Sequence, residues 1–380
     1  MTWRRFFTKI IFRTTSIRVF MTRFKFHFAS IALMATALLS CSDDTSSPTP
    51  NGPEIPPPSS SSIESSSSSI VSSSTQVNHS SFPVYELKNA PTPSKGCGTQ
   101  STLEAIKVLS NGTSKLYKMQ SAGLQREFYM DLPENYDNNK PYKILFANYF
   151  MGSSPENIAS TTDNLSFLSP YYGQKKLDAE GNYIFVAPKG ETDYNIWRHD
   201  DDKDHVFFAE MLSLLEENLC IDTSRVFVTG FSFGAMFSNS LAQDFQHRIR
   251  AVVTYSVADY NIYMPENKGK PIAWMEVHGI SDNLCPYDRL DNAITRILKN
   301  NGPEDGNGNF TDVSDEIGVM ERYTEDMGKT HVCYNFKKVD PRFPVRVCTW
   351  GGAHDWLASD NGRPADTWVP QDVRKFIEQF

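Results

Sequence analysis

The stretch Gly230-Phe231-Ser232-Phe233-Gly234 decides the fold of this chain. It follows a β-branched and aromatic run at 225–229, which predicts a strand, and it precedes residues 235–242, which predict a helix. The order strand, G-x-S-x-G, helix is typical of a nucleophile elbow, a strained turn that lifts a serine hydroxyl above a sheet. A side chain in place of either glycine would collide with neighbouring backbone. We therefore predict that Ser232 is a nucleophile, although G-x-S-x-G also occurs by chance in ordinary tight turns.

A serine nucleophile needs a base and an acid that orients the base, and in this fold class they follow in the order Ser, Asp or Glu, His. Three histidines lie well beyond the elbow: His278, His331 and His354. His354 follows the last predicted strand in Gly351-Gly352-Ala353-His354-Asp355-Trp356, where two glycines allow a close approach to the serine. We predict His354 as the base, and interpret His278 as a packing or turn residue and His331 as structural.

The orienting acid is predicted to be Asp282. It stands at the end of His278-Gly279-Ile280-Ser281-Asp282, just beyond a predicted strand. It therefore emerges at the carboxyl end of that strand, where ligand chemistry gathers in open α/β sheets. Asp259, one strand earlier, is the alternative, whereas Asp355 is too close to His354 in sequence to orient it.

An oxyanion hole requires two backbone N–H groups that face the reacting carbonyl oxygen. Phe233, at the head of the predicted helix, is expected to supply the first. The second should come from the loop that follows the strand at 142–150, from Phe150 or Met151.

The folded part is predicted to be a single α/β domain over residues 89–380. Strand and helix patterns alternate along it, which predicts a mostly parallel central sheet with helices on both faces. Strands are predicted over 126–132, 142–150, 183–187, 225–229, 251–255, 272–278 and 345–350, and helices over 204–219, 235–242, 290–298 and 370–380.

A set of stretches from position 185 onward carries a family resemblance. In order, they are Phe185-Val186-Ala187-Pro188-Lys189-Gly190, Trp197, Asp204-x-x-Phe207, Leu219-Cys220-Ile221-Asp222, the elbow, 278–282 and 351–356. In this combination the chain resembles feruloyl esterases of carbohydrate esterase family 1 over about residues 95–380, and is similar to poly(3-hydroxybutyrate) depolymerase-like esterases. The resemblance implies an α/β-hydrolase fold and a Ser232–Asp282–His354 triad. The chain departs from the family at Tyr149-Phe150, where many members have His followed by Trp or Gly, and at Ala235, where Gly is frequent.

The N-terminal residues 1–40 predict an export signal, because seven Lys or Arg and no acid precede the end of a short apolar run from Phe28 to Leu39. The sequence Leu38-Leu39-Ser40-Cys41 resembles the bacterial lipoprotein box, which implies lipidation of Cys41. A plain signal peptide with an unmodified Cys41 is the alternative, and Met21 is a second candidate start. Residues 41–88, rich in Ser and Pro, predict a disordered tether. The protein is therefore expected at the bacterial cell envelope, held by an N-terminal lipid anchor, or secreted.

The charge of the chain argues against nucleic acid as a partner. The whole chain has a formal charge of −8, and removal of residues 1–40 leaves 30 Lys and Arg against 45 acids, or −15. An acidic protein repels nucleic-acid phosphates. We expect a monomer that acts on a neutral or weakly charged substrate.

Five cysteines remain once Cys41 is assigned to the lipid, so at least one thiol is left unpaired. Export permits disulfides. We predict a Cys333–Cys348 bond, because the strand at 345–350 is expected to return beside the segment around Val332. Cys97 is expected to pair with either Cys220 or Cys285.

The chemistry predicted for this site needs no cofactor and no metal. The sequence has no C-x-x-C pair, the spacing that would suggest a zinc site. The stretch Asp305-Gly306-Asn307-Gly308-Asn309-Phe310, with Glu316 beyond it, partly matches a calcium loop but has Phe310 where the sharp turn requires Gly, so a solvated polar loop is preferred.

The predicted substrate is a hydroxycinnamoyl ester on plant cell-wall arabinoxylan. Aromatic side chains next to the expected catalytic groups suit a planar aromatic acyl group, and Tyr149 and Trp356 are predicted to bind it. The alternatives are an acetylxylan or polyhydroxyalkanoate esterase and, outside enzymes, a surface-tethered polysaccharide-binding lipoprotein.

Overall fold

The computed structural model describes residues 88–160, 170–191, 196–328 and 330–380. These residues belong to one compact unit, Phe82–Phe380. The predicted export signal, Cys41 and the predicted tether up to residue 87 lie outside the described residues. None of the described helices has the length and apolar character needed to cross a membrane.

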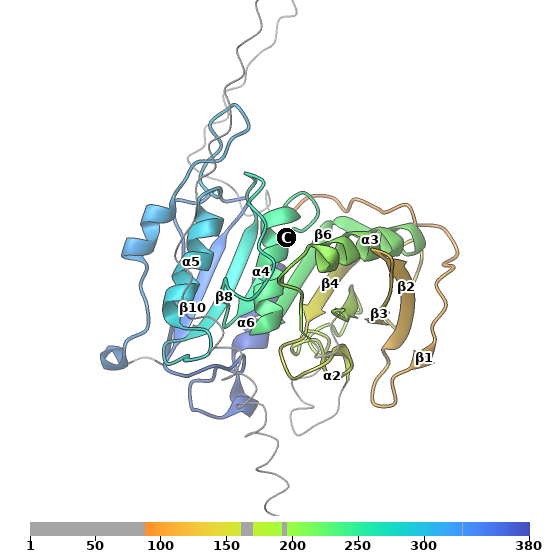
Figure 1. Cartoon of the computed structure of the whole chain (residues 1–380), viewed down its shortest axis with the longest axis horizontal. Coiled ribbons are helices and arrows are strands. Elements are labelled where there is room, and N and C mark those ends of the chain that lie inside the picture. Colours follow the sequence, from red (N-terminus) through yellow and green to blue (C-terminus); the bar gives the residue numbers. More distant parts are fainter. Residues whose placement is uncertain (1–87, 161–169, 192–195, 329) are drawn as a thin grey trace, which may run out of the picture. The chain divides into compact units, whose positions relative to one another are not determined.

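A ten-stranded sheet forms the centre of the unit (Figure 1). Its strand order is β1-β2-β3-β5-β4-β6-β7-β8-β10-β9, and the six neighbours from β5 to β10 run parallel. The strands at both edges are antiparallel to their neighbours. The bounds are β1 Lys107–Val108, β2 Lys115–Ser121, β3 Leu124–Asp131, β4 Tyr142–Asn148, β5 Tyr183–Pro188, β6 Ile221–Phe231, β7 Ala251–Tyr255, β8 Ala273–Gly279, β9 His331–Asn335 and β10 Val345–Trp350.

Helices cover both faces of this sheet. Helices α3, α4 and α5 lie on one face of the sheet (Figure 1). Helix α6 contacts the opposite layer, where the side chain of Gln174 donates to the carbonyl oxygen of Pro370. The helices are α2 Pro155–Ala159, α3 Lys203–Asn218, α4 Phe233–Asp244, α5 Tyr287–Leu298 and α6 Val369–Ile377, with short 3-10 turns at Ser314–Val319, Glu325–Met327 and Pro364–Asp366.

The mostly parallel α/β sheet predicted from the sequence is confirmed. Strands β4 to β8 are buried on both faces, which explains why their sequences are nearly continuous apolar runs. The central strand β6 begins four residues before its predicted start, because Ile221 pairs with Tyr142 of β4. The edge strands β1 and β2 were not predicted, and their exposed side chains dilute the apolar pattern.

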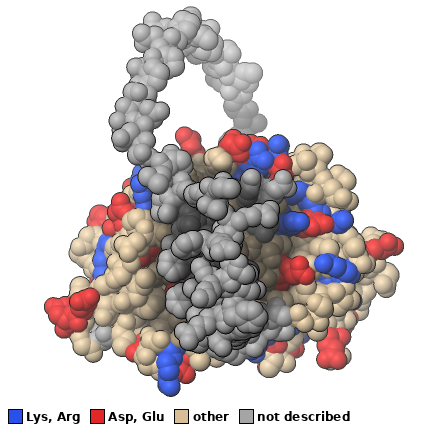
Figure 2. All heavy atoms as spheres, turned by 60° about the horizontal axis from the view of Figure 1, so that its bottom comes forward, with Lys and Arg blue, Asp and Glu red and all other residues tan. Residues whose placement is uncertain are grey.

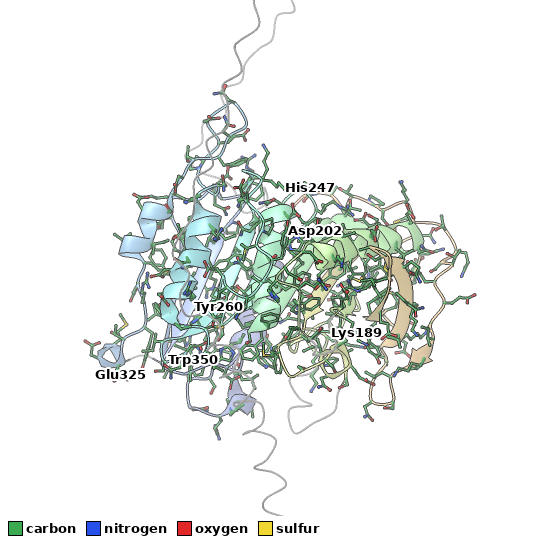
Figure 3. All side chains as sticks on the ribbon, viewed as in Figure 1. Lys189, Asp202, His247, Tyr260, Glu325 and Trp350 are labelled. Carbon is green, nitrogen blue, oxygen red and sulfur yellow. A yellow bond between two sulfur atoms is a disulfide. The ribbon has the colours of Figure 1, made fainter. Side chains whose placement is uncertain are left out.

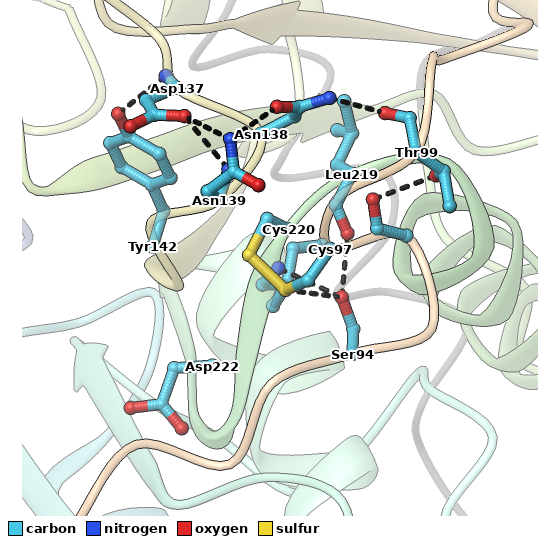
Figure 4. Close-up of a disulfide and its surroundings, with 12 residues drawn as sticks. Ser94, Cys97, Thr99, Asp137, Asn138, Asn139, Tyr142, Leu219, Cys220 and Asp222 are labelled. Carbon is cyan, nitrogen blue, oxygen red and sulfur yellow. Dashed lines mark hydrogen bonds between the residues drawn. A yellow bond between two sulfur atoms is a disulfide. The ribbon is translucent and has the colours of Figure 1, made fainter.

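The described residues contain two disulfides. Cys97 bonds to Cys220 at the junction of α3 and β6, where Ser94 also donates a hydrogen bond to the carbonyl of Leu219 (Figure 4). Cys333 bonds to Cys348, its direct neighbour across β9 and β10, as predicted. Cys285 is free and buried. Of the two partners predicted for Cys97, the structure therefore shows Cys220.

The partial calcium motif does not form a calcium loop. Asp305 accepts hydrogen bonds from the backbone N–H groups of Asn307 and Asn309. Glu316 is buried elsewhere and accepts from the hydroxyl of Tyr334 and the N–H of Lys337. The carboxylates of Asp305 and Glu316 therefore accept hydrogen bonds in separate segments and do not face one site.

Candidate active site

Ser232 occupies a strained turn between β6 and α4. Its backbone angles, φ 54° and ψ −120°, lie in a region that residues other than glycine rarely adopt. A Cβ atom at Gly230 would lie 2.3 Å from the carbonyl oxygen of Gly234, and one at Gly234 would lie 2.2 Å from that of Asn148. The two glycines are therefore required for the turn, and the structure shows the elbow predicted from the sequence.

The three predicted catalytic side chains lie in one hydrogen-bonded row. His354 Nε2 is 2.8 Å from Ser232 Oγ, and His354 Nδ1 is 2.8 Å from Asp282 Oδ2. Asp282 is an ionised acceptor, so Nδ1–H donates to it, and Nε2 is left to accept the serine proton. Asp259, the alternative acid, faces Arg289 and Arg296 instead.

The site forms at the carboxyl edge of the sheet, where β6, β8 and β10 end. Figure 3 labels Lys189, Tyr260 and Trp350, which end or follow β5, β7 and β10 at this edge. Figure 2 turns the same edge toward the viewer and shows acidic and basic side chains interspersed around it. Loops from widely separated parts of the chain therefore meet at Ser232.

The loops that carry the acid and the base are joined by backbone contacts. Ile280 N–H donates to the carbonyl of Trp350, and Ser281 N–H donates to that of Gly352. A Cβ atom at Gly279 would lie 2.4 Å from the carbonyl oxygens of Gly352 and Ala353. The glycine after β8 thus permits the approach that brings Asp282 to the imidazole.

Asp282 is held as a carboxylate. Burial alone would raise the pKa of this acid, but the hydrogen bond and charge of His354, the N–H of Cys285 and the charge of His278 together hold the pKa below its usual value. Its other oxygen, Oδ1, accepts from the N–H groups of Leu284 and Cys285 at 2.9 and 2.8 Å. The acid therefore has a fixed direction and a fixed charge.

The candidate oxyanion donors surround the elbow. Phe233 is the first residue of α4, so its N–H has no partner within the helix. Phe150 and Met151 follow β4, in a turn closed by the hydrogen bond from Ser153 N–H to the carbonyl of Phe150. Their role as donors stays a prediction.

Aromatic rings line part of the neighbourhood of the base. Phe231 lies 4.8 Å from the imidazole of His354 between ring centres, and the half-buried Phe150 packs edge-on against Phe231 at 5.1 Å. Trp356 is 9% exposed and packs edge-on against Tyr172. Phe150 is therefore the only one of Phe150, Phe231 and Trp356 that is not buried.

The prediction that Tyr149 binds substrate is wrong for its side chain. Tyr149 is fully buried, its ring lies 4.8 Å from that of Trp197, and its hydroxyl accepts the N–H of Gly190. Its carbonyl accepts from the indole N–H of Trp197. Tyr149 fixes the loop after β4 to the loop after β5, so it supports the site from the core.

Tyr172 is a contributor that the sequence did not reveal. Its buried hydroxyl donates to the carbonyl of Asn148 at 2.7 Å and lies 3.3 Å from the N–H of Phe231, which donates to it. It therefore bridges β4 and the residue before the nucleophile. No local motif marks this tyrosine, because its partners lie far away in the sequence.

The fold and this site define a serine hydrolase of the α/β-hydrolase class. Among known proteins, feruloyl esterase D of Neurospora crassa is 31% identical to the chain over 295 residues, which cover 77% of this chain and 92% of that protein. A probable feruloyl esterase C of Aspergillus terreus is 33% identical over 217 residues, covering 57% of this chain and 72% of that protein. The chain belongs to the feruloyl esterase family and is a carboxylic ester hydrolase.

More distant similarities complete the comparison. A bifunctional acetylxylan esterase/xylanase of Neocallimastix patriciarum is 25% identical over 169 residues, which cover 44% of this chain and 23% of that protein. A solved CE1 ferulic acid esterase from Anaeromyces mucronatus, in complex with ferulic acid, aligns over 55% of this chain and 85% of that chain, with 17% identity and a TM-score of 0.39. No protein-family model matches the chain.

Proposed function

We propose that this protein is a serine feruloyl esterase that releases ferulic or related hydroxycinnamic acids from plant cell-wall arabinoxylan. The observation that carries the proposal is the hydrogen-bonded row Ser232–His354–Asp282 at the carboxyl edge of the sheet. The relationship to feruloyl esterase D, over nearly the whole of that protein, supports the substrate class.

The proposed reaction begins when Ser232 Oγ attacks the ester carbonyl carbon and His354 Nε2 takes the serine proton. Asp282 keeps the imidazole in the tautomer that accepts at Nε2. The N–H of Phe233 and one from Phe150 or Met151 bind the oxyanion. His354 then protonates the departing sugar oxygen, and water resolves the acyl-enzyme with the same imidazole as base.

The acyl preference is assigned to the half-buried ring of Phe150, which packs against Phe231 beside His354. A planar hydroxycinnamoyl group gains about 0.5–1.5 kcal/mol from each good ring contact beyond area burial. An acetyl group gains nothing comparable. The burial of Tyr149 and most of Trp356 leaves less aromatic surface than the sequence predicted, and this favours acetylxylan esterase as the second candidate.

The test compares kcat/KM for methyl ferulate and for p-nitrophenyl acetate, in the parent and in Phe150→Ala. Phe150→Ala leaves the backbone N–H in place, so it separates the ring from the oxyanion role. We expect methyl ferulate hydrolysis to fall about 3- to 10-fold while acetate hydrolysis changes little. If the parent cleaves acetylated xylan but never methyl ferulate, the second candidate is correct.

The two disulfides support export, because such bonds form and persist in oxidising compartments. The finer location is part of the proposal: Cys41 carries a lipid, and the Ser-rich tether holds the esterase away from the membrane. Palmitate labelling of the expressed full chain tests it, with Cys41→Ala as the unlabelled control. Label that persists in Cys41→Ala would contradict the anchor.

A further inference from the structure

Behind the catalytic row, strand β8 carries a second acid–histidine pair, Glu276 and His278. Both side chains are fully buried and, two residues apart on a strand, leave the same face of the sheet. His278 Nδ1 lies 2.9 Å from Glu276 Oε1, and His278 Nε2 lies 2.9 Å from the carbonyl oxygen of Cys285. The reaction described above does not use this pair.

The contacts of His278 determine where its protons lie. A backbone carbonyl only accepts, so Nε2–H donates to Cys285. Glu276 Oε1 also accepts the N–H of Val257 at 3.0 Å, so the remaining contact shares one proton between the carboxylate and Nδ1. Burial alone would lower the pKa of His278, but the hydrogen bond and charge of Glu276, with a smaller contribution from Asp282, raise it above its ordinary value. The raised pKa favours the form in which His278 carries the shared proton.

Two uncharged residues flank the ring from neighbouring elements. Tyr287 of α5 meets the imidazole edge-on, with ring centres 5.7 Å apart, and Thr349 of β10 is its register partner. Glu276 Oε2 is buried and has no hydrogen-bond partner in the described structure. A buried carboxylate with an unsatisfied oxygen is costly, so we do not expect the pair to add to the free energy of unfolding.

Cys285 joins this pair to the catalytic acid. Its carbonyl accepts from His278, while its N–H donates to Asp282 Oδ1 at 2.8 Å. His278 Nε2 also lies 3.8 Å from Asp282 Oδ2, the oxygen that accepts from His354. His278 thus holds the turn at 282–285, and its protonated form places a positive charge beside the Asp282 carboxylate.

We propose that Glu276 and His278 are positioning residues for ester hydrolysis. As a buried ion pair they clamp the turn at 282–285 and keep the Asp282 carboxylate charged and directed at His354 Nδ1. The inference rests on the proposed Ser232–His354–Asp282 mechanism. Displacement of a catalytic group by about 1 Å costs on the order of 10²-fold in rate, and this sets the size of the expected effect.

Two variants remove the charge pair with little change in volume. His278→Gln retains a side-chain N–H for the Cys285 carbonyl, and Glu276→Gln retains an acceptor for Val257. Each should lower kcat for methyl ferulate by about 10²-fold and leave KM nearly unchanged. His205→Gln is the control, because His205 is another buried histidine that contacts an acid, Asp244. It should keep the parent kcat, with circular dichroism and melting curves confirming that each variant folds.

A double-mutant cycle separates positioning from general structural damage. In an Asp282→Asn background, His278→Gln should cost less than about threefold in kcat, because the residue through which it acts is already lost. Equal losses in both backgrounds, or a parent-like kcat in both single variants, would overturn the inference. If His278→Gln does not fold, the same cycle with Glu276→Gln decides. Parent-like turnover in Asp282→Asn alone would instead contradict the proposed triad.

Discussion

In the described part of the chain, one Ser–His–Asp cluster lies at the start of α4 and another lies further along it, and the proposed mechanism uses only the first. Ser232, His354 and Asp282 form the first, at the start of α4. The second lies further along α4, where His205 Nε2 is 2.5 Å from Ser240 Oγ and His205 Nδ1 is 3.2 Å from an oxygen of Asp244. Residue types and distances alone therefore do not distinguish a catalytic site from a structural one.

The direction of the protons distinguishes the two clusters. Ser240 donates its hydroxyl proton to the carbonyl of Tyr263, at 2.6 Å, so His205 must donate to the serine rather than accept from it. Ser232 has His354 as its side-chain partner in the described structure, and its proton points at the base. Ser240 is also fully buried in regular helix, whereas Ser232 stands on a strained turn beside the first N–H groups of α4.

Replacement of the two histidines should give the largest contrast. His354→Ala removes the base from a unit whose members act together, and should lower kcat/KM for methyl ferulate by about 10⁴- to 10⁶-fold. His205→Ala should lower the melting temperature and leave kcat near the parent value at a temperature well below melting. Substantial turnover in folded His354→Ala would contradict the assignment of the base.

Replacement of Asp282 should lower kcat and replacement of Asp244 should not, and this contrast should be smaller than the one between the two histidines. Asp282→Asn keeps the size of the side chain but favours the wrong imidazole tautomer, and should lower kcat by about 10⁴-fold. Asp244→Asn should leave kcat unchanged. Steady-state kinetics on both proteins, with matched circular dichroism spectra, checks this; a larger loss in Asp244→Asn would reverse the roles given to the two clusters.

The parts of the site that could be predicted from the sequence are those marked by local patterns. The elbow has its glycines next to it, and His354 follows a recognisable strand and a Gly-Gly pair. The exposure of Tyr149 could not be predicted, because Trp197 and Gly190, which bury it, come from a distant loop. The partner of Cys97 was equally hidden, since 123 residues separate it from Cys220.

The disulfide at the edge of the sheet joins β9 to β10, and β10 leads into the loop that carries His354. Its closed loop spans 15 residues, so removal should cost about 3 kcal/mol in the chain-entropy description. We expect Cys333→Ser/Cys348→Ser to melt at a lower temperature by several degrees. Cys285→Ser is a control that leaves both disulfides intact. Equal melting temperatures for the parent and the double variant would show that the bond does not stabilise β10.

The smallest expected effect is a pH dependence of the melting temperature that arises from Asp244, in the cluster of Ser240, His205 and Asp244. The hydrogen bond from His205, with further help from Lys268, lowers the pKa of Asp244 to about 2. A depressed carboxyl pKa stabilises the fold above the unfolded pKa of about 4, and this contribution is lost as the pH falls toward 2. Asp244→Asn should therefore melt below the parent at pH 7, and the gap should close between about pH 4 and 2. A gap that stays constant across this range would contradict the ion pair.

The most direct test of the central claim is to label the reactive serine. A fluorophosphonate probe reacts with a serine whose hydroxyl is activated by a neighbouring base, and peptide mapping by mass spectrometry locates the adduct. We predict one adduct per chain, on Ser232, in the parent and in Ser240→Ala, and none in folded Ser232→Ala. An adduct on Ser240, or undiminished labelling of Ser232→Ala, would contradict the account.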